Sequence, residues 1–319
     1  MPPLINRRSL LIGAASSPAL AIAAHAAGLA DGAADPVAEP GRIVHWRNVE
    51  SEHVGPRDVT IWLPQEAAGP LPVIYAHDGE NLFDNAVSVD DFPLNLDAAM
   101  GALAASGVGP AIIVGIWATA ERTREYNAQS VVDDLPGHVR EAVELSCEGA
   151  LSSEAYLTFI TDELKPRVDA EFDTLPDAAN TFTFGVSMGG LIAVEALATR
   201  PDIFGGAVAM SAHMFMMGPA SANPDFPMPP DAFPEIEAAL TRLGERMPDP
   251  ATHRLWIDHG TIDLDQYYSG SHKALADGLI AAGWKPTESL EARVYVGTGH
   301  HGSWWIPRVP EALRFLLTA

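Results

Sequence analysis

The residues best suited to chemistry form a Gly-x-Ser-x-Gly pentapeptide at positions 185–189. It follows an apolar run, Thr181–Phe184, and precedes residues 190–198, whose composition is typical of a helix. A serine on such a sharp strand-to-helix turn is raised above the sheet edge, where its hydroxyl can attack a carbonyl. The N–H of Met188, at the helix start, can then stabilise the oxyanion that forms. The pattern predicts Ser187 as a nucleophile and Met188 as an oxyanion-hole donor.

A serine nucleophile needs a base that takes its proton and returns it to the leaving group. The last apolar run before the C-terminus leads into a glycine-flanked loop, residues 297–302, which contains His300 and His301. We predict His300 as the base. His301 remains the alternative, because pattern alone does not separate adjacent residues on a loop.

The base in turn needs a carboxylate that orients it. In folds that carry their nucleophile on this strand-to-helix turn, the chain order is Ser, Asp or Glu, then His. Asp258 ends a strand-like run, and Asp263 and Asp265 follow on the loop. Either loop residue can face the imidazole while the other caps the next helix. The residues themselves leave Asp263 and Asp265 open.

A second oxyanion donor is expected after the predicted strand Val73–His77, where residues 77–81 read His-Asp-Gly-Glu-Asn. The glycine lets the backbone turn its N–H groups toward the serine, so Gly79 or Glu80 is the predicted donor. His77 and Asp78 resemble metal ligands, but no further ligands follow at the required spacing. The sequence therefore predicts neither a metal site nor a cofactor.

Several aromatic and histidine side chains lie near predicted strand ends and are candidates for the substrate pocket. They can hold an aryl or acyl group or stack on a sugar. Core packing is the alternative for about half of them, since aromatic residues are commonly buried. The predicted substrate-binding residues are Trp117, His213, Tyr267, Trp304 and Trp305, with Met214, Phe215 and Tyr268 as neighbours.

The elements that position these residues alternate between short apolar runs and helical patterns. This order is typical of a mostly parallel sheet flanked by helices, here an α/β-hydrolase fold. The predicted strands are Val59–Leu63, Val73–His77, Ala111–Trp117, Thr181–Phe184, Ala207–Met210, Arg254–Asp258 and Arg293–Val296. The predicted helices are Leu94–Ala105, Tyr156–Phe172, Gly189–Thr199, Ser271–Ala282 and Glu311–Leu317.

Two segments break this alternation. Residues 118–155 are polar and read as irregular. Residues 212–250 are rich in proline and methionine and contain a short helical pattern at Ile236–Leu243. Long excursions between strands are often lids or pocket walls, so the second segment is predicted to be a short lid-like insertion, with surface decoration as the alternative.

Composition and charge limit the function classes. Hydrophobic residues make up 47% of the 319 residues, as in an ordinary folded protein, and the formal net charge is −23. A surface this acidic repels phosphate backbones, which argues against nucleic acid as a partner. The single cysteine, Cys147, excludes an intramolecular disulfide.

The N-terminal region has the layout of an export signal. Arg7 and Arg8 precede a short apolar run, and Ala24-His-Ala26 supplies small residues before a cleavage position. The arginine pair predicts a twin-arginine-type signal peptide over residues 1–26, then a flexible lead-in over 27–40 and an α/β-hydrolase domain over 41–319. The run is too short to span a membrane, so a periplasmic or secreted location without stable membrane insertion is expected.

Short motifs carry a family resemblance from residue 75 nearly to the C-terminus. They are Tyr75–Asp84, Val114–Trp117, Arg122–Tyr126, Glu163–Pro166, Gly185–Leu191, Pro201–Gly205, Asp258–Thr261 with Leu264 and Asp265, and Gly297–His300 with Trp305. In this order they resemble the putative-esterase family of α/β-hydrolases, which includes esterase D-like and enterochelin-esterase-like proteins. The resemblance implies ester hydrolysis with Ser187 and His300, and it places Asp265 ahead of Asp263.

The chain departs from the family pattern at two positions near the expected site. Ala118 stands where similar members often have Asn, and Gly302 stands where an acidic residue often follows the histidines. These departures bear on substrate specificity more than on the reaction type.

The predicted function is a serine esterase that hydrolyses a small-molecule or carbohydrate-linked carboxylic ester through an acyl-enzyme. An acyltransferase with the same triad is one alternative, and a non-catalytic binding protein on a hydrolase scaffold is another. Hydrolysis of a ferric siderophore ester is a further possibility within the family, weakened by the acidic surface. The sequence does not indicate the oligomeric state.

Overall fold

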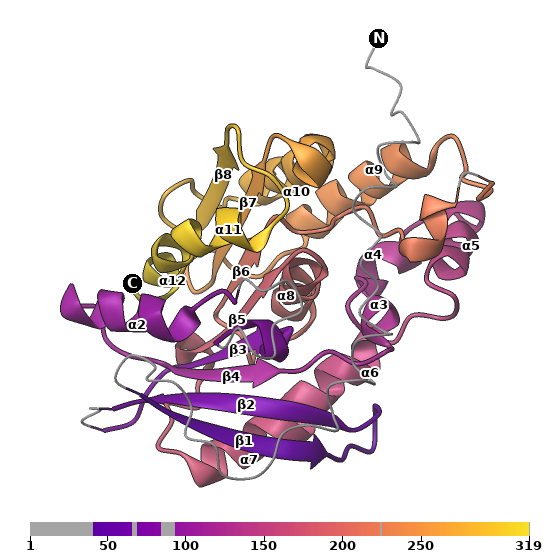
Figure 1. Ribbon diagram of the computed structural model, residues 1–319. Helices are drawn as coiled ribbons and strands as arrows, with labels where there is room; N and C mark the ends of the chain where they lie inside the picture. The colour runs from indigo at the N-terminus through magenta and orange to yellow at the C-terminus, as the bar shows by residue number, and fades with distance from the viewer. Residues whose placement is uncertain (1–40, 66–68, 84–92, 224, 319) are drawn as a thin grey trace.

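The computed structural model describes residues 41–65, 69–83, 93–223 and 225–318, and its centre is an eight-stranded sheet. The strand order is β1-β2-β4-β3-β5-β6-β7-β8, which Figure 1 shows from the bottom of the view to the top. The strands are β1 (Gly41–Val49), β2 (Arg57–Pro64), β3 (Val73–His77), β4 (Ile112–Ile116), β5 (Thr181–Val186), β6 (Gly206–Met210), β7 (Arg254–Gly260) and β8 (Leu290–Tyr295).

The sheet is mixed, with one strand running against the others. β2 pairs antiparallel with both β1 and β4, whereas every pairing from β4 through β8 is parallel. β3, β4, β5 and β6 are buried along their whole length, as expected for parallel strands covered on both faces. Loops that follow these strands therefore emerge at one common edge, where ligands bind in open α/β sheets.

The two faces of the sheet pack two separate hydrophobic cores. Side chains alternate between faces along a strand, so Val73 and Tyr75 of β3 enter one core while Ile74 and Ala76 enter the other. One core is closed by α2 (Leu96–Ala105) and α12 (Val309–Leu317). The other is closed by α8 (Met188–Thr199) with α9 (Ala232–Glu245), α10 (Ser269–Ala281) and the helices before β5 (Figure 1). The sheet is thereby held between two helical layers, as an α/β fold requires.

The longer helices include those that the sequence predicted, with shifted ends. The described α-helices are α2 (Leu96–Ala105), α3 (Arg122–Glu125), α4 (Gln129–Asp133), α5 (Gly137–Ser146), α6 (Ser153–Thr158), α7 (Lys165–Glu171), α8 (Met188–Thr199), α9 (Ala232–Glu245), α10 (Ser269–Ala281), α11 (Gly302–Trp305) and α12 (Val309–Leu317). A π-helical turn, η3 (Phe159–Leu164), joins α6 to α7. The predicted helix at 156–172 is this α6–η3–α7 segment.

Two expectations about the elements were wrong. The segment 118–155, read as irregular, contains α3, α4 and α5, and the first two are too short to show a helical period. Strand β1 was not predicted, because it is an edge strand in which only Trp46 is buried, so it lacks the alternation of a half-buried strand.

Other expectations lie beyond what the structure describes. The predicted signal peptide and lead-in, residues 1–40, fall outside the described ranges. Among the described residues, no helix combines the length and the apolar character that crossing a membrane requires.

Candidate active site

The predicted site residues come together at the edge of the sheet where the parallel strands end. Ser187 follows β5 directly, and Asp265 and His300 lie on the loops after β7 and β8. The loop after β3, with Gly79 and Glu80, reaches the same edge. Residues far apart in the sequence thus become neighbours because parallel strands deliver them to one place.

Ser187 sits on a strained turn between β5 and α8. Its φ of 55° and ψ of −124° lie outside the ordinary regions for a non-glycine residue. Gly185 permits the turn, because a Cβ there would lie 2.2 Å from the carbonyl carbon of Gly189. The Ser187 N–H donates to the carbonyl of Met210 at 3.0 Å, which ties the turn to β6.

His300 bridges the serine and the carboxylate. Its Nε2 lies 2.9 Å from Ser187 Oγ, and its Nδ1 lies 2.7 Å from Asp265 Oδ1. A carboxylate only accepts hydrogen bonds, so Nδ1 carries the proton and Nε2 is left to accept the serine hydroxyl proton. This is the tautomer that a general base requires.

The structure brings Asp265, rather than Asp263, to the imidazole. Asp265 is fully buried, while Asp263 is exposed at the start of η6 (Asp263–Tyr267) with a φ of 52°. Burial by itself would raise the pKa of Asp265. Hydrogen bonds from His300, Ser211 and the Gly260 N–H outweigh that effect and hold the pKa below its ordinary value.

The neighbouring histidine, His301, has a different position. It is the N-cap of α11, where its Nδ1 accepts the backbone N–H of Ser303 at 3.2 Å. The same nitrogen lies 2.9 Å from the Ser303 hydroxyl. Its ring is therefore engaged in capping this short helix.

The predicted oxyanion donors lie at the start of α8 and on the loop after β3. Met188 is the first residue of α8, where backbone N–H groups have no partner within the helix. Gly79 begins the single turn η2 (Gly79–Asn81) and packs so closely on β4 that a Cβ would lie 2.4 Å from the carbonyl carbon of Gly115. The loop also touches α8, because a Cβ on Gly189 would lie 3.1 Å from Asp78 Oδ2.

Two anchors hold this loop in its conformation. Asp78 adopts a left-handed backbone with φ 57°, and its N–H donates to Tyr126 Oη at 3.2 Å. Arg122 clamps the Asp78 carboxylate through Nε and Nη2 of its guanidinium, at 2.6 and 2.8 Å. A bidentate arginine fixes orientation as well as charge, so the clamp defines the direction of the loop.

Glu80 buries a carboxyl group in the same loop. Its side chain is folded in, and Oε2 accepts the N–H of Ala118 at 3.1 Å. Burial, followed by the nearby Asp78 carboxylate, raises the pKa of Glu80 to about 7.

His77, the metal-like residue of the sequence, lies in a closed polar network. Its two ring nitrogens meet Tyr156 Oη at 2.9 Å and Thr183 Oγ1 at 3.0 Å. Burial lowers the pKa of His77 to about 3, so the ring is neutral. Within the described parts of the chain, no three His, Cys, Asp or Glu side chains gather as metal ligands.

His213, a predicted pocket residue, contacts Ser187 through its backbone. Its backbone N–H donates to the Ser187 carbonyl at 3.0 Å, and Nε2 donates to the Met217 carbonyl at 3.2 Å. Nδ1 therefore accepts the Tyr268 hydroxyl at 2.9 Å. Burial, then the nearby His300, lowers the pKa of His213 to about 4.

The remaining pocket candidates have varied surroundings. Trp305 is buried and meets the His300 ring edge-on at 4.9 Å, whereas Trp304 is 40% exposed. Tyr267 is half-buried at the end of η6. Trp117 donates its indole N–H to Thr60 on β2, so its polar contact is with the strand edge.

The proline- and methionine-rich segment, residues 212–250, packs against the hydrophobic core in the part that the structure describes. Met214, Met216 and Met217 are buried, and α9 covers one face of the sheet. Its role as a lid stays a prediction.

Sequence reasoning overlooked two residues near the site. His272 is buried, with Nε2 donating to the Ala212 carbonyl at 3.0 Å and Tyr268 stacked on its ring. Ser211, which donates to Asp265 Oδ2 at 2.6 Å, had no distinguishing motif.

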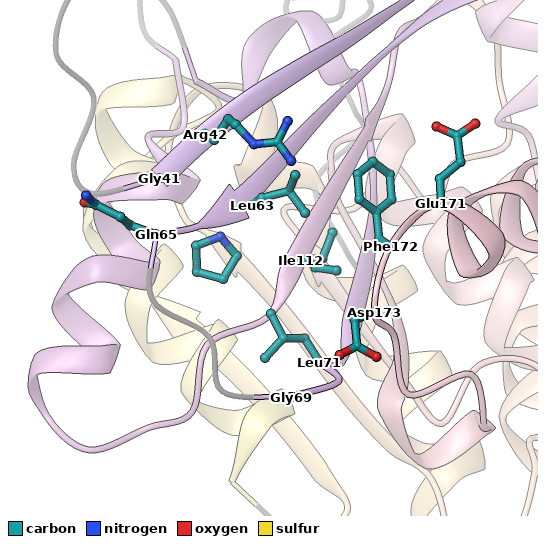
Figure 2. Close-up of a pocket in the computed structure, with 11 residues that line it drawn as sticks. Gly41, Arg42, Leu63, Gln65, Gly69, Leu71, Ile112, Glu171, Phe172 and Asp173 are labelled. Atoms are coloured by element: carbon teal, nitrogen blue, oxygen red, sulfur yellow. The ribbon is translucent and has the colours of Figure 1, made fainter.

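A cavity of about 670 Å³ lies at the opposite edge of the sheet (Figure 2). Its walls come from the start of β1, the end of β2, the start of β4 and the chain after α7, including Arg42, Leu63, Ile112 and Phe172. None of the predicted site residues lines it. The hollow is therefore separate from the Ser187–His300–Asp265 arrangement.

Comparison with known proteins gives a family and a set of relatives. Residues 52–316 match the family described as "Putative esterase". A siderophore triacetylfusarinine C esterase of Aspergillus fumigatus is 33% identical over 141 residues, which is 44% of this chain and 43% of the relative. A ferri-bacillibactin esterase of Bacillus subtilis is 33% identical over 105 residues, which is 31% of this chain and 35% of the relative. These matches span less than half the length of either relative.

A solved structure supports the fold. The BES protein from Bacillus cereus superposes with a TM-score of 0.60 at 19% identity, covering 92% of this chain and all (100%) of that one. At this level of identity the likeness concerns the fold alone.

Proposed function

Because the chain belongs to the putative-esterase family, and is accordingly a serine hydrolase acting on ester bonds, we propose that Ser187, His300 and Asp265 form its catalytic triad. The observation that carries the proposal is the continuous relay from Ser187 Oγ through the His300 ring to Asp265, at 2.9 and 2.7 Å. The strained backbone of Ser187 supports it further, since such strain gathers at functional sites.

In the proposed acylation step, Ser187 Oγ attacks the ester carbonyl as its proton passes to His300 Nε2. The carbonyl oxygen becomes an oxyanion that the N–H groups of Met188 and of Gly79 or Glu80 stabilise. Asp265 keeps the imidazolium oriented and stabilises its charge. The tetrahedral intermediate then collapses, the C–O bond breaks, and the leaving alcohol takes the proton from Nε2.

In the proposed deacylation step, water takes the place of the alcohol. His300 Nε2 removes a proton from the water as its oxygen attacks the acyl carbonyl of the ester on Ser187. Collapse of the second tetrahedral intermediate releases the carboxylic acid and returns the proton to Ser187 Oγ. Every proton is supplied by the chain or by the two reactants, so the cycle balances without a cofactor.

We propose a small-molecule ester as the substrate, with a siderophore ester as the favoured class. Two relatives named for siderophore esters support this choice. The net charge of −23 weighs against a strongly anionic ester, so we propose a siderophore ester that carries little negative charge.

The test is hydrolysis of p-nitrophenyl esters of graded acyl length by wild-type protein and by Ser187→Ala. We expect kcat/KM to fall by at least about 10³-fold in Ser187→Ala, because the nucleophile and the triad act as a unit. Ser269→Ala, which removes an exposed serine hydroxyl from α10, should keep wild-type activity. Retained activity in Ser187→Ala, or a wild type that neither turns over esters nor reacts with a fluorophosphonate, would refute the proposal.

The organisation and location of the chain are also proposals. We propose that residues 1–26 direct export by the twin-arginine route, that 27–40 form a lead-in, and that 41–319 form the hydrolase domain. The arginine pair and the small residues at 24–26 support this assignment. Mass spectrometry of protein recovered from the periplasm or medium tests it by the position of its N-terminus.

A further inference from the structure

Ser211 lies directly after β6, beneath the proposed triad, in an unusual backbone conformation. It is fully buried, and its φ of 43° is one that non-glycine residues rarely adopt. Its N–H donates to the carbonyl of Asp258 at 2.9 Å, which holds the turn against the end of β7. The strain is sustained by the surrounding structure, and it aims the side chain at the buried carboxylate.

The hydroxyl proton of Ser211 has only one available direction. Trp305 Nε1 and Arg308 Nη1 approach Ser211 Oγ at 3.0 and 3.4 Å, and both groups can only donate. The oxygen therefore accepts from these two side chains. Its single proton must go to Asp265 Oδ2, 2.6 Å away.

The donors behind Ser211 are themselves held in place. Arg308 forms a buried ion pair with Asp258 at 2.8 Å, and Trp256 Nε1 donates to the other Asp258 oxygen at 2.8 Å. The Trp305 ring also meets His300 edge-on. Buried hydrogen-bonded networks of this kind restrict the groups that they surround.

We infer that Ser211, oriented by Trp305 and Arg308, is a positioning residue that holds Asp265 with Oδ1 toward His300. This inference rests on the proposed triad and adds a connected set of residues from β6, α11 and η7 (Ile306–Arg308) behind it. Asp265 Oδ2 is occupied by Ser211 Oγ–H and by the Gly260 N–H at 2.6 Å, so the carboxylate cannot rotate without losing both.

The pH profile of kcat/KM separates positioning from mere structural support. Removing a donor from Asp265 makes the carboxylate more basic, so His300 holds its second proton more strongly. His300 must be neutral to act as the base, so the acidic limb should move to higher pH. The other titratable or charged groups around Asp265 and His300 stay unchanged in the variants below. They are Asp258, Arg308, His213, Tyr268 and His272.

Ser211→Ala is the primary test, since alanine keeps the Cβ and the same backbone preferences. We expect kcat to fall about 10-fold or more, as for small displacements of catalytic groups, and the acidic limb to rise by several tenths of a pH unit. Trp305→Phe keeps an aromatic ring against His300 and deletes the N–H donor. It should shift the limb in the same direction by less.

Ser106→Ala is the matched control. The Ser106 hydroxyl likewise donates to one oxygen, the Leu103 carbonyl at 2.8 Å, and accepts from Arg314 at 2.7 Å. This variant removes the same pattern of one donated and one accepted hydrogen bond at an exposed position away from His300, so the acidic limb should stay in place.

The outcomes distinguish this inference from the proposed function. Wild-type kcat and an unmoved acidic limb in both Ser211→Ala and Trp305→Phe would overturn the inference while leaving the triad intact. If Ser211→Ala does not fold, Trp305→Phe decides. Failure of the wild type itself to hydrolyse esters would instead refute the proposed function.

Discussion

Glu80 places an ionisable group beside the proposed oxyanion hole, and its burial links the stability of the protein to pH. The folded state raises its pKa from 4.5 to about 7. Between these values the folded state binds more protons than the unfolded state, so the free energy of unfolding falls as the pH rises. The loss is complete above pH about 7 and absent below about 4.5.

Glu80→Gln should therefore stabilise the protein at alkaline pH and change little at acidic pH. The amide has the same shape but no charge to desolvate, and the gain is on the order of 3 kcal/mol at most. We expect a melting temperature several degrees above wild type at pH about 8 and near equality at pH about 5. Glu141→Gln, on the exposed side of α5, is the control. A difference that does not depend on pH would show that ionisation of Glu80 is not its cause.

The two loop aspartates give a second residue-scale prediction. Asp265→Asn should lower kcat by about 10⁴-fold, because an amide beside His300 Nδ1 favours the wrong imidazole tautomer. The kcat of Asp263→Asn should stay within a few-fold of wild type, because Asp263 is exposed and His300 Nδ1 bonds to Asp265 instead. Steady-state kinetics on one p-nitrophenyl ester measure both, and equal losses would contradict the assignment.

At the residue scale, sequence reasoning was most specific where a motif stood next to its structural context. The Gly-x-Ser-x-Gly turn and the glycine-flanked histidine pair pointed to Ser187 and His300, which the structure joins at 2.9 Å. The choice between aspartates needed the family pattern, because both lie on one loop. Ser211 had no signal, since its link to Trp305 spans 94 positions and exists only after β6 and α11 meet.

At the element scale, the turn between β5 and α8 depends on the absence of a side chain at Gly185. Gly185→Ala would force a Cβ to within 2.2 Å of backbone atoms of Gly189. We expect destabilisation of roughly 3 kcal/mol or more and loss of fluorophosphonate labelling, because backbone atoms cannot yield as a flexible side chain can. Thermal melts and labelling rates measure these effects.

Gly137→Ala supplies the contrast for that prediction. Gly137 begins α5, and a Cβ there meets nothing within 4 Å. Alanine should stabilise the protein slightly, by about 0.4–1 kcal/mol, because it restricts the unfolded chain. If both glycine variants behave alike, the close approach at Gly185 does not explain its presence.

Element prediction depended on burial. Strands β3 and β5 are buried throughout because helices cover both faces, so they were predicted from their largely apolar composition. Strand β1 was missed because Trp46 is its one buried residue, and α3 and α4 were missed because each is only a turn or so long. Tertiary contacts stabilise such elements, and local sequence carries little trace of them.

At the scale of the whole molecule, the net charge of −23 should govern which esters reach the site. An ester whose acyl chain ends in a carboxylate should react more slowly than a neutral ester of matched length. Salt should narrow the gap, because the screening length falls from about 30 Å at 0.01 M to about 3 Å at 1 M. The ratio of the two kcat/KM values, followed across sodium chloride concentrations, tests this, and a ratio independent of salt would contradict it.

The π-helical turn between α6 and α7 has a consequence for how the family can vary. Before this turn, Tyr156 Oη contacts His77, which precedes the loop after β3. After it, Lys165 Nζ donates to the Pro176 carbonyl at 2.9 Å. A π-turn holds one residue more than an α-turn, and each residue rotates a helix by about 100°. Both contacts therefore fit one helix only because that residue is present. Insertion or deletion of one residue here would rotate either Tyr156 or Lys165 away from its partner. This segment should therefore accept fewer changes of length than surface loops do.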